Sequence, residues 1–226
     1  MINSPFSLFA RYAHRVRVIQ CEKSDALLSS DTAPIRRAFG SSDIAALVQE
    51  HGSTIVRAEE PIDRTATGDG LLTHRQGLVL TIRHADCQSF VLYAPTHHVA
   101  GVLHVGWRGI LCDAIGAWFS ALTREWGILP RDVFVGAGPS LCTSCADFSD
   151  PLRELPGLSP ALVSGRTVNL RAAAEAQFVR AGLPMEHFER MEDCTRCTPN
   201  RWWTYRGGDA EAVKAGYTNV LAIMLL

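Results

Sequence analysis

Runs of apolar residues are clearest in the middle of the chain. Three short runs rich in β-branched residues are apolar on both faces, which predicts strands covered on both sides over 78–83, 90–94 and 99–104. Further strands are expected over 16–21, 133–137, 202–205 and 219–226. The spacing therefore predicts a sheet core whose strands are short and mostly buried.

Helical spacing is strongest after the third of these strands. Apolar residues recur every three or four positions from Ile110 to Leu122, which predicts a helix that opens at 106–109 and ends at Trp126, with Gly127 as its stop. Shorter helices are expected over 34–39, 42–50 and 170–181. Asn169 is the expected cap of the last one, and 150–167, rich in Pro, Gly and Ser, is expected to be irregular.

Strands and helices intermingle along the chain, and no linker of low hydrophobicity separates them. The pattern predicts a single α/β domain over residues 1–226, with mixed β-sheets layered with helices. Hydrophobic residues make up 47% of the chain, enough for a sizeable core. The net charge of -1 and a pI near 6.7 give no general attraction to nucleic acid or to an acidic membrane.

The start of the chain has no basic segment followed by an apolar one, so a signal peptide is not expected. No apolar stretch approaches the roughly 18 residues of a membrane span. We therefore expect a cytoplasmic protein, and the oligomeric state stays open.

Three residues that can bind metal stand at the predicted edges of elements, next to small or turn-forming residues: His51, Cys87 and His104. Two imidazoles and a thiolate suit zinc, and three protein ligands with one open position are typical of a catalytic zinc site. Taken singly, each signal is weak, because a lone histidine or buried cysteine is more often structural. If the three form one site, their ligand atoms should lie within about 4 Å of one another.

The chain has seven cysteines, an odd number that cannot be fully paired in disulfides. Four of them form two C-x-x-C pairs, Cys142 with Cys145 and Cys194 with Cys197. In a reducing compartment such pairs fit a second, structural zinc site. The alternatives are free thiols or an accidental cluster.

Seven motifs, in this order, resemble those of the laccase-domain family, also called multicopper polyphenol oxidases and now regarded as enzymes that process purine nucleosides. The motifs are Gln49-Glu50-His51-Gly52, Asp69-Gly70-Leu71-Leu72-Thr73, His84-Ala85-Asp86-Cys87, Leu103-His104-Val105-Gly106-Trp107-Arg108-Gly109, Gly138-Pro139, Cys194-Thr195 and Trp202-Trp203-Thr204-Tyr205-Arg206. The family's opening motifs, which are expected to help bind substrate, are not recognisable in residues 1–46. The resemblance indicates a diverged member.

The resemblance implies a zinc-dependent purine nucleoside phosphorylase that acts on adenosine and inosine with phosphate, with possible adenosine deaminase activity. It implies that His51, Cys87 and His104 hold the zinc. Arg108, together with N–H groups at a helix start, would hold phosphate. Asp86 would point away from Cys87 on an extended chain, and would orient a ligand histidine or serve the open side of the metal.

Each of these roles has a simpler alternative. Gly106 and Gly109 could serve only a tight turn that leaves Arg108 on the surface, and Asp86 could cap a turn. Asp69, which opens the Asp69-Gly70-Leu71 motif, could equally be a turn former. His84 is the only other histidine expected near the site.

Two other functions compete with the phosphorylase. A His₂Cys set is also found in blue-copper centres, but a multicopper oxidase needs a further histidine cluster built from H-x-H motifs. The chain has eight histidines and no H-x-H, which argues against copper polyphenol oxidase activity. A non-catalytic metal- or nucleoside-binding protein is the remaining alternative.

Overall fold

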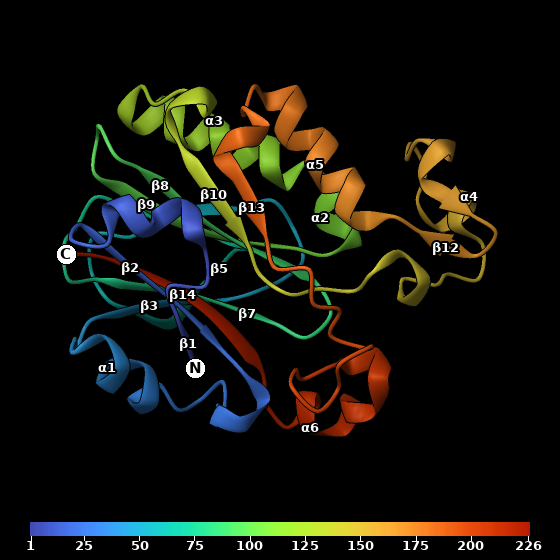
Figure 1. The fold of residues 1–226 in the computed structure, drawn as a ribbon, viewed down its shortest axis with the longest axis horizontal. Helices are drawn as coiled ribbons and strands as arrows, with labels where there is room; N and C mark the ends of the chain where they lie inside the picture. Colours follow the sequence, from blue (N-terminus) through green and yellow to red (C-terminus); the bar gives the residue numbers. More distant parts are fainter.

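The computed structural model describes residues 1–226 and places two mixed six-stranded sheets against each other (Figure 1). The first sheet has the order β1 (Ile2–Asn3), β2 (Val16–Cys21), β14 (Asn219–Leu225), β7 (Val79–His84), β3 (Ile44–Val48) and β5 (Ile62–Thr67). The second has the order β13 (Phe188–Arg190), β10 (Phe134–Ala137), β8 (Gln88–Ala94), β9 (Val99–Val105), β6 (Gly70–Thr73) and β4 (Ile55–Arg57). A separate hairpin pairs β11 (Val163–Ser164) with β12 (Thr167–Val168).

The helices are α1 (Ala33–Phe39), α2 (Trp107–Leu111), α3 (Ala114–Trp126), α4 (Pro151–Glu154), α5 (Leu170–Ala181) and α6 (Ala210–Lys214), and some of them cover the outer faces of the sheets. The pair α3 and α5 lies against the second sheet, and α1 lies against the first (Figure 1). None of the helices combines the length and apolar content that crossing a membrane would need.

Apolar layers between the sheets and on their outer faces hold this arrangement together. Between the sheets, Leu80 and Val91 are fully buried, and on the outer face of the second sheet Trp118 packs from α3. Every residue of β8, β9 and β14 is buried, because each strand is covered on both sides. The predicted single α/β domain with mixed sheets and layered helices is confirmed.

Most predicted elements are present with small shifts at their ends. Asn169 caps α5 as expected, since its side chain accepts a hydrogen bond from the N–H of Ala172 at 3.0 Å. Gly127 adopts a left-handed conformation (φ 68°) directly after α3. The segment 150–167 is largely irregular but contains α4 and β11.

The helix expected over 42–50 is wrong. Residues 44–48 form β3, which runs parallel to both β7 and β5. Its first four residues are buried. A short apolar run that is covered on both faces carries no periodicity that separates strand from helix, and here the neighbouring strands decide the conformation.

Two further predictions need correction. The strand expected over 202–205 is absent: Thr204 accepts a hydrogen bond from the N–H of Gly207 at 3.0 Å and caps a helical turn, Tyr205–Asp209. The helix expected over 106–126 is two helices, because Asp113 adopts a left-handed conformation (φ 53°) between α2 and α3. Aspartate is one of the few residue types that tolerate this conformation.

Candidate metal centre

The ends of three strands bring His51, Cys87 and His104 together. His51 lies in the loop after β3, Cys87 in the turn between β7 and β8, and His104 near the end of β9. Because β8 and β9 are antiparallel with Gln88 opposite Val105, Cys87 is placed beside the end of β9. The three ligand atoms lie within 4.8 Å of one another, a wider bound than the 4 Å expected, and the group is able to hold a metal ion.

A buried carboxylate, Asp69, organises this group. It accepts hydrogen bonds from the N–H groups of His51 (3.0 Å) and Gly52 (2.7 Å) and from Nδ1 of His104 (2.8 Å). The first two bonds wrap the loop around the carboxylate and hold His51 at a φ of 64°. The third fixes the ring of His104 and leaves Nε2 for another partner.

From the sequence alone, Asp69 opens one of the seven motifs and could equally be a turn former. Its role depends on pairing across the sheet: β6 begins at Gly70, which lies opposite Leu103 of β9, so Asp69 comes beside His104. The sequence therefore shows a carboxylate directly before a buried strand. Its contact with His104 can be inferred only once the pairing of that strand with β9 is known.

The electrostatics of the group favour a thiolate. Burial raises the pKa of the Cys87 thiol, but the charge and hydrogen bonds of His104, with those of His51, lower it to about 6. Burial lowers the pKa of His104, but the Cys87 thiolate and Asp69 raise it to about 9. Since the thiolate is the form of cysteine that binds metals, the sulfur is prepared for an ion.

The space around the group also suits an ion. A Cβ atom on Gly106 would lie 3.0 Å from Sγ of Cys87 and 3.3 Å from Cδ2 of His51, so glycine keeps the space beside the sulfur free. His104 is buried and His51 is exposed. The three candidate ligands are therefore enclosed by protein on the side of His104 and open to solvent on the side of His51. This arrangement fits a metal with one free coordination position.

The open side faces a cavity of about 490 Å³, within the range of small-molecule sites. Besides the three candidate ligands, its lining includes Arg83, His84, Asp86, Trp107, Arg108, Tyr205, Arg206 and Tyr217. A wider hollow of about 610 Å³ lies along α3 and α5, but no histidine or cysteine lines it. The smaller cavity is the better candidate site because histidines and a cysteine that can bind a metal line it.

Three arginines line this cavity. Arg108 is exposed, stacks over the Trp107 ring at 4.1 Å and forms no ion pair. Arg206 is held by the carbonyl oxygen of Asp147, to which its Nη1 donates at 2.6 Å. Arg83, which sequence reasoning missed, is half-buried without an ion pair, and burial together with Arg64 lowers its pKa to about 10. Arg206 also pairs with the Asp147 carboxylate at 3.4 Å, so Arg83 and Arg108 are the two arginines without a carboxylate partner.

His84 lies in the cavity lining, near the candidate ligands as expected. Burial and the charge of His104 lower its pKa to about 3, so the ring is neutral. Its Nε2 lies 3.2 Å from Nε2 of Gln20, and its Nδ1 has no hydrogen-bond partner.

Asp86 is a buried hydrogen-bond acceptor beside the same cavity. Its Oδ1 accepts from the hydroxyls of Thr195 (2.7 Å) and Thr204 (2.6 Å), and its Oδ2 from the N–H of Arg206 (2.7 Å). The expected bond from Asp86 to a ligand histidine is thus absent, because Asp69 makes it instead. The expectation that Asp86 serves the open side of the site remains a prediction.

Comparison with known sequences decides the family. The family described as multi-copper polyphenol oxidoreductase laccase matches residues 18–224. This chain belongs to that family. The resemblance seen in the seven motifs is therefore confirmed over nearly the whole chain.

Relatives within this laccase-domain family carry two kinds of name. An adenosine deaminase from an unknown prokaryotic organism is 28% identical over 149 residues, covering 61% of this chain and 56% of that protein. The purine nucleoside phosphorylase YlmD of Geobacillus stearothermophilus is 30% identical over 152 residues, covering 61% and 54%. The purine nucleoside phosphorylase of Mus musculus is 31% identical over 147 residues, covering 61% and 34%. The chain spans about half the length of the first two relatives and a third of the last.

Solved structures share the laccase-domain fold over almost the whole chain. The hypothetical protein YfiH of Bacillus licheniformis superimposes with a TM-score of 0.78 at 19% identity, covering 93% of both chains. YlmD of Geobacillus stearothermophilus superimposes with a TM-score of 0.75 at 23% identity, covering 97% of this chain and 93% of the other. The coverage includes most of residues 1–46, where the sequence motifs were not recognisable.

Proposed function

We propose that this chain is a zinc-dependent purine nucleoside phosphorylase that acts on adenosine and inosine, with deamination of adenosine as a second activity. One observation carries the proposal: a His-Cys-His group with an open side shares a cavity with arginines that lack carboxylate partners. The names of the relatives, purine nucleoside phosphorylase and adenosine deaminase, supply the substrate class.

His51, Cys87 and His104 would hold the zinc, since nitrogen and thiolate donors with one free position suit that ion. When bound, zinc would supply Lewis acidity to the open side of the site. Asp69 keeps His104 in the orientation that binding needs. A copper oxidase is less well supported, because the only other cluster of side chains that could hold a metal consists of four cysteines and no histidine.

The phosphate would bind to Arg83, Arg108 and Arg206, whose charges stabilise an anion in the cavity. In phosphorolysis a phosphate oxygen bonds to the anomeric carbon of the ribose. The bond from that carbon to the purine nitrogen breaks, and the purine takes a proton. Adenosine and phosphate thus give adenine and ribose 1-phosphate. The faces of Trp107, Tyr205 and Tyr217 in the lining suit a flat purine.

Replacing Arg108 by Ala tests the phosphate role and the proposed function together. Zinc should stay, because a guanidinium is no metal ligand. Phosphorolysis should fall by about 10²-fold or more if Arg108 stabilises charge in the transition state. Deamination, which consumes water and not phosphate, should fall less. Adenine and inosine are measured by chromatography over a phosphate titration.

The control for Arg108 is Arg124→Ala, which removes an exposed arginine outside the cavity and should change neither product. An equal loss of both products in Arg108→Ala, at every phosphate concentration, would mean that Arg108 is only structural. If wild-type protein forms no adenine in response to phosphate, the proposed phosphorylase activity itself is wrong.

Replacing Asp69 by Asn should weaken zinc binding by about 10–100-fold, the usual effect of losing a carboxylate that orients a ligand histidine. In the native protein both oxygens accept hydrogen bonds, so the amide NH₂ of Asn would face a donor at one of them. Zinc affinity is measured by competition with a chromophoric chelator. Asp63→Asn, at an exposed position of β5 without side-chain hydrogen bonds, is the control. Unchanged affinity in Asp69→Asn would remove the orienting role.

A further inference from the structure

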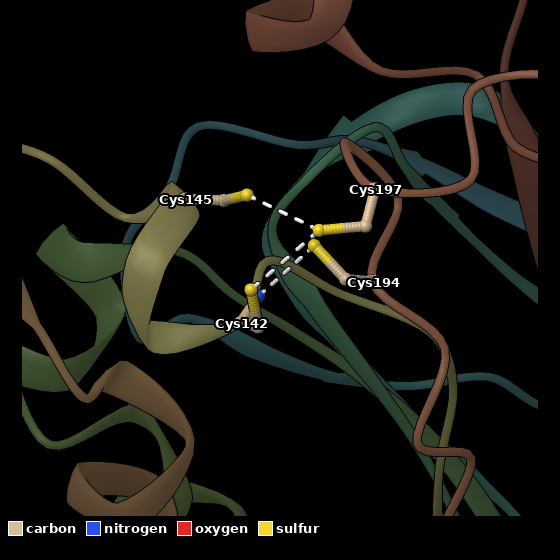
Figure 2. Close-up of side chains that lie close together, drawn as sticks. All are labelled: Cys142, Cys145, Cys194 and Cys197. Carbon is tan, nitrogen blue, oxygen red and sulfur yellow. Dashed lines mark hydrogen bonds between the residues drawn. The ribbon is translucent and has the colours of Figure 1, made fainter.

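Four cysteines from two distant segments gather at one place in the fold. In the segment after β10, Cys142 precedes a single tight turn, Thr143–Cys145, and Cys145 is its last residue. Cys194 and Cys197 lie in the segment after β13, and Cys194 pairs with Ser140 in an isolated parallel bridge. Figure 2 shows the side chains of the two pairs pointing toward one another.

The distances between the sulfurs fit an ion and not disulfides. Sγ of Cys197 lies 3.5 Å from Sγ of Cys145 and 3.9 Å from Sγ of Cys142, and all four sulfurs are within 4.8 Å of one another. A disulfide needs about 2.05 Å. Four sulfurs at about 2.3 Å from a central zinc form a tetrahedron with edges of about 3.8 Å. The distances of 3.5 Å and 3.9 Å from Sγ of Cys197 lie on either side of that edge.

The backbone around the cluster supports bound thiolates. The N–H of Cys142 donates to Sγ of Cys194 at 3.2 Å, a bond that stabilises negative charge on the sulfur. The N–H groups of Cys145 and Ala146 both donate to the carbonyl of Cys142 at 3.1 Å, which closes the turn between the first two cysteines. Cys145 and Cys194 are buried and Cys197 is exposed, so an ion can enter from one side.

Apolar packing at this place is slight. The local core contains only Leu141, Cys145, Ala146 and Cys194 as buried residues. Two of these four are the cysteines themselves. Such a small cluster contributes little hydrophobic stabilisation, so the two segments need another source of cohesion.

We propose that Cys142, Cys145, Cys194 and Cys197 bind a structural zinc ion that ties the two segments together. Four thiolates fill the tetrahedron and leave no position for a substrate, which is typical of structural sites. The site shares no residue with the His51–Cys87–His104 group, so this inference does not rest on the proposed function.

The four-cysteine zinc site would also position one wall of the cavity beside the His51–Cys87–His104 group. Thr195 lies between the last two cysteines, and its hydroxyl donates to Asp86, which in turn accepts from the N–H of Arg206. On the other segment, the carbonyl of Asp147 accepts from the guanidinium of Arg206. Asp147, which contacts Arg206 directly, and Thr195, which reaches it through Asp86, each lie within two residues of a cysteine in the cluster.

Metal analysis of wild-type protein and of Cys87→Ala, both purified under reducing conditions, tests the inference. Cys87→Ala should retain one zinc per chain, because its four clustered cysteines are intact. Its cobalt(II) derivative should show the absorption of a tetrahedral four-thiolate centre. A variant with serine at all four cluster positions should lose one zinc relative to wild type, whereas Cys112→Ser, at an exposed position outside the cluster, should lose none.

The outcomes separate this inference from the proposed function. One zinc in both wild type and Cys87→Ala would support the cysteine site and contradict the His-Cys-His centre. Metal-free Cys87→Ala, iron in place of zinc, or four cluster thiols that react freely with a thiol reagent before chelation would overturn the inference. If the quadruple serine variant does not fold, the metal content and cobalt spectrum of Cys87→Ala still decide whether the four cysteines bind zinc.

Discussion

Replacing His104 by Ala should remove zinc from the His51–Cys87–His104 group and lower phosphorolysis and deamination together. His104 is buried and supplies one of three ligand atoms, so its loss leaves two ligands and removes the partner of Asp69. We expect each activity to fall by at least about 10²-fold, the scale of losing one electrostatic stabiliser of a transition state. Zinc content and both rates are measured on the same preparation.

The matched control for His104 is His97→Ala, which removes an exposed histidine with no side-chain hydrogen bond. It should keep both zinc and activity. The His104→Ala protein should still hold the zinc of the four-cysteine site, so its zinc content should fall by one ion per chain and not to zero. Full activity in a His104→Ala protein that has lost one zinc would show that the centre is not catalytic.

Replacing Asp86 by Ala should have the largest effect on stability. Two buried hydroxyls and the N–H of Arg206 lose their shared acceptor, and unsatisfied buried donors cost about 1–3 kcal/mol each. The backbone of Asp86 is also left-handed (φ 91°), which adds strain for alanine. We expect the free energy of unfolding to fall by about 3 kcal/mol or more, measured by denaturant titration.

Asp86→Ala should also lower both activities by about 10²-fold through displacement of Arg206, because small misplacements of binding groups cost that much. In Asp86→Asn, asparagine tolerates the left-handed backbone and keeps an oxygen that accepts from the two hydroxyls. Its NH₂ faces the N–H of Arg206, so the loss of stability and of activity should be intermediate. Asp132→Ala, at an exposed site without side-chain bonds, should stay within about 0.5 kcal/mol of wild type. If Asp86→Ala behaves like Asp132→Ala, the three bonds do not support the cavity wall.

Sequence reasoning predicted those parts of the fold in which local signals and burial agree. The strands over 78–104 were predicted because their residues are apolar on both faces, and α5 because Asn169 caps it. It failed over 42–50, where a run that suits a helix or a strand becomes β3 between two neighbours. It also failed over 202–205, where Thr204 starts a helical turn by accepting from a backbone N–H.

In the candidate site, too, residues with a local sequence signal were predicted and contacts across the sheet were not. His51, Cys87 and His104 were found because each stands in a short motif of recognisable order, and the structure brings them together. The contact of Asp69 with His104 and the place of Arg83 in the cavity lining were missed, because both depend on what lies across the sheet. Asp69 meets His104 through the register of β6 and β9, and Arg83 reaches the cavity from the end of β7. Nothing in the sequence neighbours of Arg83 indicates its position in the cavity lining.

The rate of adenosine phosphorolysis as a function of zinc bound at the His51–Cys87–His104 group tests the central claim most directly. Protein stripped with a chelator is given back zinc in steps, with adenosine present and with or without phosphate. We predict that adenine and ribose 1-phosphate appear in equal amounts, only with phosphate, and at a rate that rises with the zinc restored to this group. Unchanged adenosine in zinc-loaded protein with phosphate, or adenine formation that does not respond to zinc, would contradict the account.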